Sequence, residues 1–287
     1  MRTLFRLLWR ALIFPFRLVG ATYRELRKLL MDEPEDSPLV DSIQKAVENP
    51  SDILAHLNAL RKHIFRAIGV LLLTSLVSLI FAAQIIDKLA EPVGGISKLI
   101  AIDPTEPLGV VMRVALLTGF TLSFPYIALE LWLFAAPGLS RDARLFGLAA
   151  IPIGTLFFLG GMAFAYFVML PTALPFLINF MGFTTQIRPS SYIKFITGIM
   201  FWIGVAFEFP LVIYVLARVG LVRGKVLADQ WRLAIVLMAV LSAAITPTVD
   251  PVNMSLVMGP MIGLYFLSIG LAYLAERARI RRRVQTA

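Results

Sequence analysis

The feature that most constrains this chain is the apolar run at residues 192–218, which holds one carboxylate, Glu208. The run is long enough to cross a bilayer as a helix. A charge near the bilayer centre costs roughly 2.5–3.5 kcal/mol on insertion scales, so this carboxyl must face protein or water, find a partner or stay protonated. Pro210 removes a backbone donor nearby and predicts a bend. Glu208 is therefore the leading candidate site. The alternative is a carboxyl that only ties two helices together.

Composition indicates a membrane protein. Of the 287 residues, 59% are hydrophobic and 16% charged, and mean hydropathy is +0.81. A soluble domain has about 25% charged residues. Because long apolar runs recur between short polar breaks, the sequence predicts an all-α polytopic membrane protein rather than a barrel. Cysteine is absent, and His56 and His63 are the only histidines, so we expect no enzyme activity, metal or cofactor.

Four regions are predicted along the chain. Residues 1–31 place their cations within about 100° of a helical wheel, which favours a basic amphipathic helix on an anionic membrane surface. The alternative is a cleaved signal peptide, although arginines interrupt its apolar core. Residues 32–54 are predicted to form an acidic linker and a short helix. A six-span domain at 55–283 and a tail at 284–287 follow.

Six spans are predicted, at about residues 65–86, 108–133, 145–170, 192–218, 233–246 and 252–274. The fifth is only about 21 Å long at 1.5 Å per residue, shorter than the hydrocarbon core of roughly 30 Å. We therefore expect a thinned bilayer or polar shielding beside it. The longer breaks at 87–107 and 171–191 contain prolines and apolar patches, and each predicts short interfacial helices on the outer face.

The distribution of cations predicts that both termini are cytoplasmic. The net charge of +9 does not indicate nucleic acid, because the basic residues cluster at the ends of apolar runs. Alternate breaks carry most of them: Arg61, Lys62, Arg66, Arg141, Arg144, Arg218, Arg223, Lys225, Arg232, Arg277, Arg279, Arg281, Arg282 and Arg283.

Five segments together resemble one known family. HLNALRKHI, SFPYIALELWLFAAPGL, FAYFVMLPTALPFLINF, SYIKFITGIMFWIGVAFEFPLVIYVL and ITPTVDP occur in this order within a six-span chain. The set resembles the TatC subunit of the twin-arginine protein translocase, from about His56 to Ala275. The resemblance implies a fold of six tilted helices in a glove-like concave cup, in the inner (cytoplasmic) cell membrane.

The resemblance also implies a function. A TatC-like chain would be a receptor for the twin-arginine signal peptides of folded precursor proteins. It would recruit single-span TatA and TatB partners, contact membrane lipid and self-associate, and the proton-motive force would power export. The alternative from another class is a proton-coupled small-solute transporter that uses Glu208 as its relay.

Carried over position by position, the resemblance implies a signal-peptide surface and one intramembrane partner or proton site, Glu208. The family's cytoplasmic-loop glutamate aligns with Ala143, and the glutamate of its N-terminal motif aligns with Ala59. We therefore expect Asp142 to supply the acidic contact for arginine. The surface residues are Leu57, Leu60, Arg61, Phe134, Pro137, Leu139, Asp142 and Arg144.

The other polar residues near the spans receive simpler interpretations. Arg66 and Glu130 stand close to span ends, where their side chains could reach the interface, and Glu130 could instead pair with an arginine. The Gly160–Gly161 pair is interpreted as a close helix contact.

Overall fold

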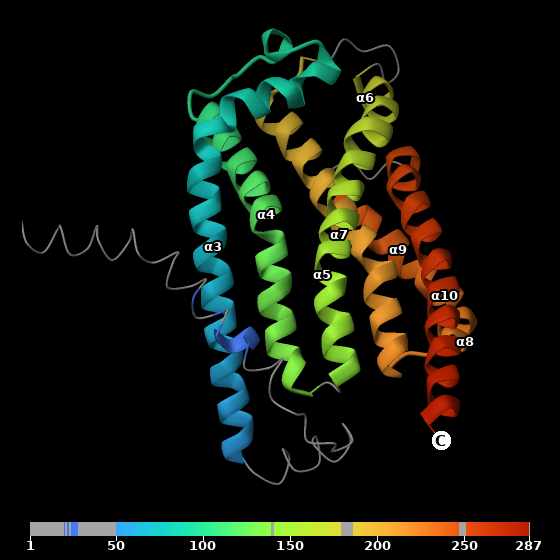
Figure 1. The fold of residues 1–287 in the computed structure, drawn as a ribbon. Coiled ribbons are helices and arrows are strands. Elements are labelled where there is room, and N and C mark those ends of the chain that lie inside the picture. Colours follow the sequence, from blue (N-terminus) through green and yellow to red (C-terminus); the bar gives the residue numbers. More distant parts are fainter. Residues whose placement is uncertain are drawn as a thin grey trace, which may run out of the picture. The chain divides into compact units, whose positions relative to one another are not determined.

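The computed structural model describes residues 20, 22, 24–27, 50–138, 141–178, 186–246 and 251–286 (Figure 1). The chain divides into two compact units. Unit 1 comprises residues 1–74 and 122–151, and unit 2 comprises residues 75–121 and 152–287. The regular structure of the described residues is helical, apart from one isolated bridge, so the predicted all-α class is confirmed.

The helices account for every predicted span. In chain order they are α3 (Pro50–Ala90), α4 (Glu106–Ala135), α5 (Arg141–Phe164), α6 (Leu170–Ile178), α7 (Pro189–Val219), α8 (Gly224–Asp229), α9 (Trp231–Ile245) and α10 (Pro251–Thr286). Among the described residues, five helical stretches are long and apolar enough to cross a membrane. Helix α9, which corresponds to the fifth predicted span, has 15 residues and is about 22 Å long at 1.5 Å per residue. The predicted short fifth span is thus confirmed.

Two helices cross the predicted boundaries between regions of the chain. Helix α3 begins at Pro50, so residues 50–54 belong to this helix rather than to the predicted linker. Helix α10 continues to Thr286, across the predicted boundary at 283. The acidic linker and the short helix predicted before residue 50 lie outside the described residues, as does most of the predicted surface helix at 1–31.

A wider helical turn joins α5 to α6. Residues Ala165–Met169 form a π-helical turn, η4, between the two helices. Pro171 and Pro175 follow it, and neither has an N–H to donate to the preceding turn. Missing donors of this kind are a common cause of local departures from α-helical geometry. The break predicted at 171–191 therefore opens with the short helix α6.

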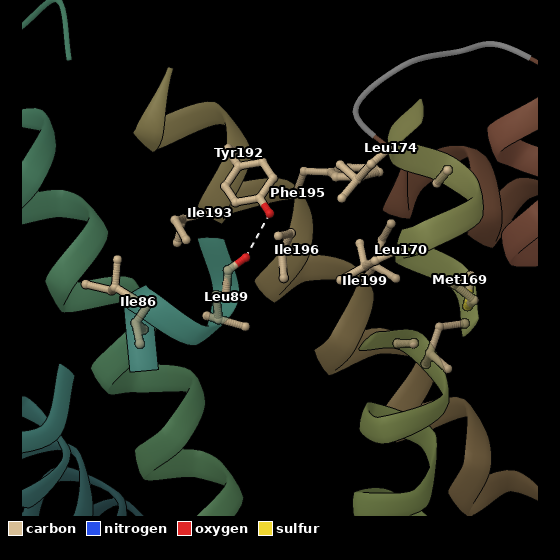
Figure 2. Packing of buried hydrophobic residues seen from close by; sticks show 14 of the residues in the cluster. Ile86, Leu89, Met169, Leu170, Leu174, Tyr192, Ile193, Phe195, Ile196 and Ile199 are labelled. Atoms are coloured by element: carbon tan, nitrogen blue, oxygen red, sulfur yellow. Dashed lines mark hydrogen bonds between the residues drawn. The ribbon is translucent and has the colours of Figure 1, made fainter. Parts of the chain in front are cut away.

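The core of unit 2 joins the two long breaks. Aliphatic side chains of α3, α6 and α7 pack around Tyr192, whose hydroxyl donates a 2.8 Å hydrogen bond to the carbonyl of Leu89 (Figure 2). The break at 87–107 contains the short 3₁₀ helices η1 (Glu91–Val93) and η2 (Ile96–Lys98). Leu99 and Ile187 form a parallel bridge between the breaks. The predicted short helices are present in both breaks.

Candidate functional site

A buried carboxylate, Glu130 on α4, lies at the centre of unit 1 with only 1% of its surface exposed. Its Oε1 accepts hydrogen bonds from Thr22 at 2.8 Å and from Tyr126 at 2.6 Å. Its Oε2 lies 2.6 Å from His63 Nδ1 and 3.8 Å from Arg66 Nη1. Both oxygens of this buried carboxyl therefore have hydrogen-bond partners within the protein, which is what burial of a polar group demands.

A short N-terminal turn, formed by the described residues of 20–27, supplies part of this network. Glu25 accepts hydrogen bonds from Lys62 at 2.5 Å and from Arg66 at 2.5 and 3.1 Å. Burial acts to raise the pKa of Glu25, but the hydrogen bonds from Arg66 and Lys62 outweigh it and lower the pKa to about 2. The carboxylate is therefore ionised at neutral pH, and it links the turn to α3.

The last turn of α4 contacts α3 through the aromatic ring of Phe134. The ring of Phe134 lies 4.4 Å from the ring of His56 and 6.3 Å from that of His63, measured between centroids. These two histidines are seven residues apart, so they share one face of α3. Two sequence segments that the family resemblance singled out, around residues 56–64 and 123–139, therefore meet in unit 1.

The predicted surface residues of α3 lie beside this contact. Leu57 is 53% exposed, and Arg61 is exposed with its guanidinium 5.5 Å from the ring centroid of Phe65. Leu60 is half-buried. An exposed leucine one turn from an exposed arginine offers both an apolar and a polar contact to a ligand.

Arg144 has a different environment from the one predicted. It is 7% exposed, and its Nε donates to the carbonyl of Ala136 at 2.9 Å and its Nη2 to that of Pro137 at 3.3 Å. These carbonyls belong to the turn Ala136–Gly138 that follows α4. The cation therefore holds the loop in shape from within. Pro137 itself is exposed.

The side chains of two predicted residues, Leu139 and Asp142, lie outside the described set. Leu139 lies outside the described residues. Asp142 stands in the first turn of α5, and its side chain lies outside the described set. The contacts expected of them remain predictions.

Glu208, in unit 2, is half-buried on α7. Its Oε1 is buried and has no hydrogen-bond partner among the described residues. Its Oε2 lies against Gly154 of α5: a Cβ atom added to this glycine would be 2.9 Å from the oxygen. Helix α7 continues through Pro210. The carboxyl thus packs against a residue without a side chain and retains an unused acceptor.

Close packing of α5 on α7 forms the wall beside this carboxyl. A Cβ on Gly161 would come within 2.9 Å of the Cα of Gly204 and of the carbonyl oxygen of Ile203. The helices therefore touch backbone to backbone at Gly161, as the predicted glycine contact requires. Its neighbour Gly160 faces open space, so only one of the two predicted glycines is at the contact.

Two sequence interpretations were wrong. Glu130 and Arg66 do not reach the interface, because both are buried and paired in unit 1. The paired alternative for Glu130 is the one observed. Sequence reasoning also missed Thr22, Glu25 and Tyr126. One signal was present: Tyr126 and Glu130 are four residues apart and share a helical face.

Comparison with known proteins gives one consistent family. A family model described as the Sec-independent protein translocase protein TatC matches residues 55–260. A TatC from Koribacter versatilis (strain Ellin345) is 37% identical over 193 residues, covering 66% of this chain and 71% of the relative. A TatC from Carboxydothermus hydrogenoformans is 31% identical over 228 residues, covering 78% of this chain and 94% of the relative.

A solved structure is similar as well. It is described as the twin-arginine translocase receptor TatC, and it matches with a TM-score of 0.69 at 32% identity. The match covers 77% of this chain and 99% of the crystallised one.

Proposed function

The chain belongs to the TatC family of membrane-embedded, Sec-independent protein translocase subunits, and from that premise we propose that it is the receptor that binds twin-arginine signal peptides. The observation that carries the proposal is the meeting of α3 and the end of α4 at Phe134 in unit 1. An exposed leucine, Leu57, stands near it. Such a surface suits the apolar stretch of a peptide, whose paired cations would need a carboxylate nearby.

The predicted residues would have different roles in binding the signal peptide. Leu57, Leu60 and Phe134 would accept the apolar part of the signal peptide, and Asp142 would accept one arginine through a charge-assisted hydrogen bond. Arg61, Pro137 and Leu139 would border this binding surface. Arg144 would act indirectly, since its guanidinium holds the loop carbonyls rather than facing a ligand.

The second part of the function concerns Glu208. Its unused oxygen would receive a polar group from a single-span TatA- or TatB-type helix in the membrane. Gly154 supplies no side chain that could relay a proton through α5. This favours a partner-docking site over a small-solute transporter. The proposal has four further parts. The chain would self-associate and contact lipid in the inner membrane, with both termini cytoplasmic. The proton-motive force would drive export.

Photocrosslinking tests the receptor function. A photoreactive residue at Phe134 in membrane vesicles should crosslink a precursor whose signal carries two arginines, and should lose that crosslink when both are lysine. Asp142→Asn should abolish it. Equal crosslinking of both precursors to the unsubstituted protein would refute the receptor proposal, and unchanged crosslinking in Asp142→Asn would remove Asp142 from the binding surface.

A further inference from the structure

The N-terminal turn of unit 1 carries a carboxylate beside the proposed receptor surface. We propose that Glu25 binds one arginine of the precursor's pair, by releasing Lys62 and accepting the incoming guanidinium in its place. The inference rests on the proposed receptor function and extends it, because a pair of arginines calls for a second carboxylate besides Asp142.

The turn is fixed on unit 1 by contacts on two sides of Glu25. Thr22 is 3% exposed, and its hydroxyl donates to Glu130 at 2.8 Å. Leu26 packs against the apolar cluster of Trp132, Leu133 and Ala136 at the end of α4. A buried polar contact and an apolar one together hold the turn in register, so the position of Glu25 is set by the fold.

The two cations that hold Glu25 differ in accessibility. The Arg66 side chain is 9% exposed and donates through two nitrogens, whereas the Lys62 side chain is 57% exposed and donates through one. Exposed lysine–carboxylate pairs contribute little to stability, because water screens them. A guanidinium offers a planar fork of donors that lysine lacks. Lys62 is therefore the partner that an arginine can displace, while Arg66 remains.

Glu25 is available for this exchange. Its side chain is 30% exposed, and its depressed pKa keeps it ionised throughout the physiological range. It thus presents a permanent negative charge at the surface of unit 1. Because the Glu25 side chain is partly exposed, a ligand can reach it without unfolding the turn.

The exchange site and the aromatic contact lie on the same turns of α3. His63, whose ring faces Phe134, follows Lys62 directly in the chain, and Arg66 stands one turn further on. His63 also contacts Glu130, which in turn binds Thr22 of the N-terminal turn. A peptide whose apolar stretch reaches Phe134 would therefore bring its arginines past Lys62.

Two substitutions with opposite expected effects test the inference on the full-length protein in vesicles, with crosslinking from Phe134 to a twin-arginine precursor. Glu25→Gln removes the acceptor and should lower crosslinking at least 10-fold. Lys62→Ala removes the competing cation and should raise it several-fold. Glu91→Gln is the matched control for the first, because Glu91 also forms an exposed pair with a lysine, Lys88. Arg27→Ala, on the same exposed turn, controls for the loss of a positive charge.

The outcomes separate the inference from the receptor proposal. If the unsubstituted protein fails to distinguish arginine from lysine precursors, the receptor function itself fails. If it distinguishes them but Glu25→Gln binds equally well, Glu25 is not a contact. If both Glu25→Gln and Lys62→Ala lower crosslinking alike, the pair is only structural. A rise in crosslinking with Glu25→Gln would mean that the turn covers the surface, which also overturns the inference.

Discussion

The two units each bury a carboxyl group, and they treat it in opposite ways. Glu130 in unit 1 has donors on both oxygens, from Thr22, Tyr126 and His63. Glu208 in unit 2 packs against the bare backbone of Gly154 and has an oxygen with no partner among the described residues. An unsatisfied buried acceptor costs roughly 1–3 kcal/mol. The fold thus satisfies both oxygens of Glu130 and leaves one oxygen of Glu208 able to accept a further hydrogen bond.

The comparison also separates stability from function. Removing Glu130 takes away the shared hydrogen-bond partner of Thr22, Tyr126 and His63. Removing Glu208 takes away a carboxyl group whose Oε1 has no partner among the described residues. The same chemical change should therefore damage the fold in unit 1 and the activity in unit 2. Substitutions in each unit and a change of pH test this contrast between stability and activity.

Glu130→Ala should have the largest effect on stability. The substitution leaves His63, Thr22 and Tyr126 without the carboxylate they share, while Arg66 keeps Glu25. Each buried group left without its hydrogen-bond partner costs roughly 1–3 kcal/mol. We expect a clear fall in the midpoint of thermal unfolding of the purified protein in detergent. Glu130→Gln keeps an acceptor oxygen and should cost less. Equal stability of Glu130→Ala and the unsubstituted protein would mean that the network contributes nothing to the fold.

Gly161→Ala should cost about 1–3 kcal/mol, because the added methyl group would overlap the backbone of Gly204 and force α5 away from α7. Gly160→Ala is the matched control one residue earlier. It meets open space, and should be neutral or stabilising by up to about 1 kcal/mol through helix propensity. Unfolding of both variants in the same detergent gives the comparison. A larger loss at Gly160 would contradict the described contact.

Glu208→Gln should change the free energy of unfolding by less than about 1 kcal/mol, since no hydrogen bond to its Oε1 is lost. Export of a twin-arginine precursor into vesicles should nevertheless fall strongly. Measuring both on one preparation is essential to the contrast with Glu130. If Glu208→Gln unfolds as readily as Glu130→Ala, the carboxyl is a structural tie, which was the alternative interpretation of this residue.

Acidification should release the N-terminal turn, as the smallest effect. The pKa of Glu25 is lowered from 4.5 to about 2, so its stabilising contribution is complete above about pH 4.5 and disappears as the pH falls through 2. Amide exchange of residues 20–27 should therefore increase over that range. The dependence should be absent in Glu25→Gln, and an identical pH profile in that variant would show that another group controls the turn.

Much of the fold could be predicted from the sequence because lipid imposes strict rules. Apolar runs had to become helices, and the length of α9 followed from its short run at 233–246. Glu208 stood out because one carboxylate interrupts such a run. These inferences need only local sequence and the thickness of a bilayer.

The pairings of unit 1 could not be predicted in the same way. Glu25 contacts a residue 41 positions away, and Thr22 contacts one 108 positions away. No local pattern encodes such distances. The contacts of Arg144 could not be predicted for a related reason: its carbonyl acceptors, Ala136 and Pro137, lie eight and seven residues back in the chain.

The attachment of α7 at its first residues restricts how this helix can move. Tyr192 is bonded to Leu89, Arg188 pairs with Glu106, and Ile187 bridges Leu99. Sliding of α7 along its axis would break all three contacts. Glu208 lies 16 residues beyond Tyr192, about 24 Å along the axis. Contacts at one end of α7 therefore fix the axial position of a carboxyl more than four turns away.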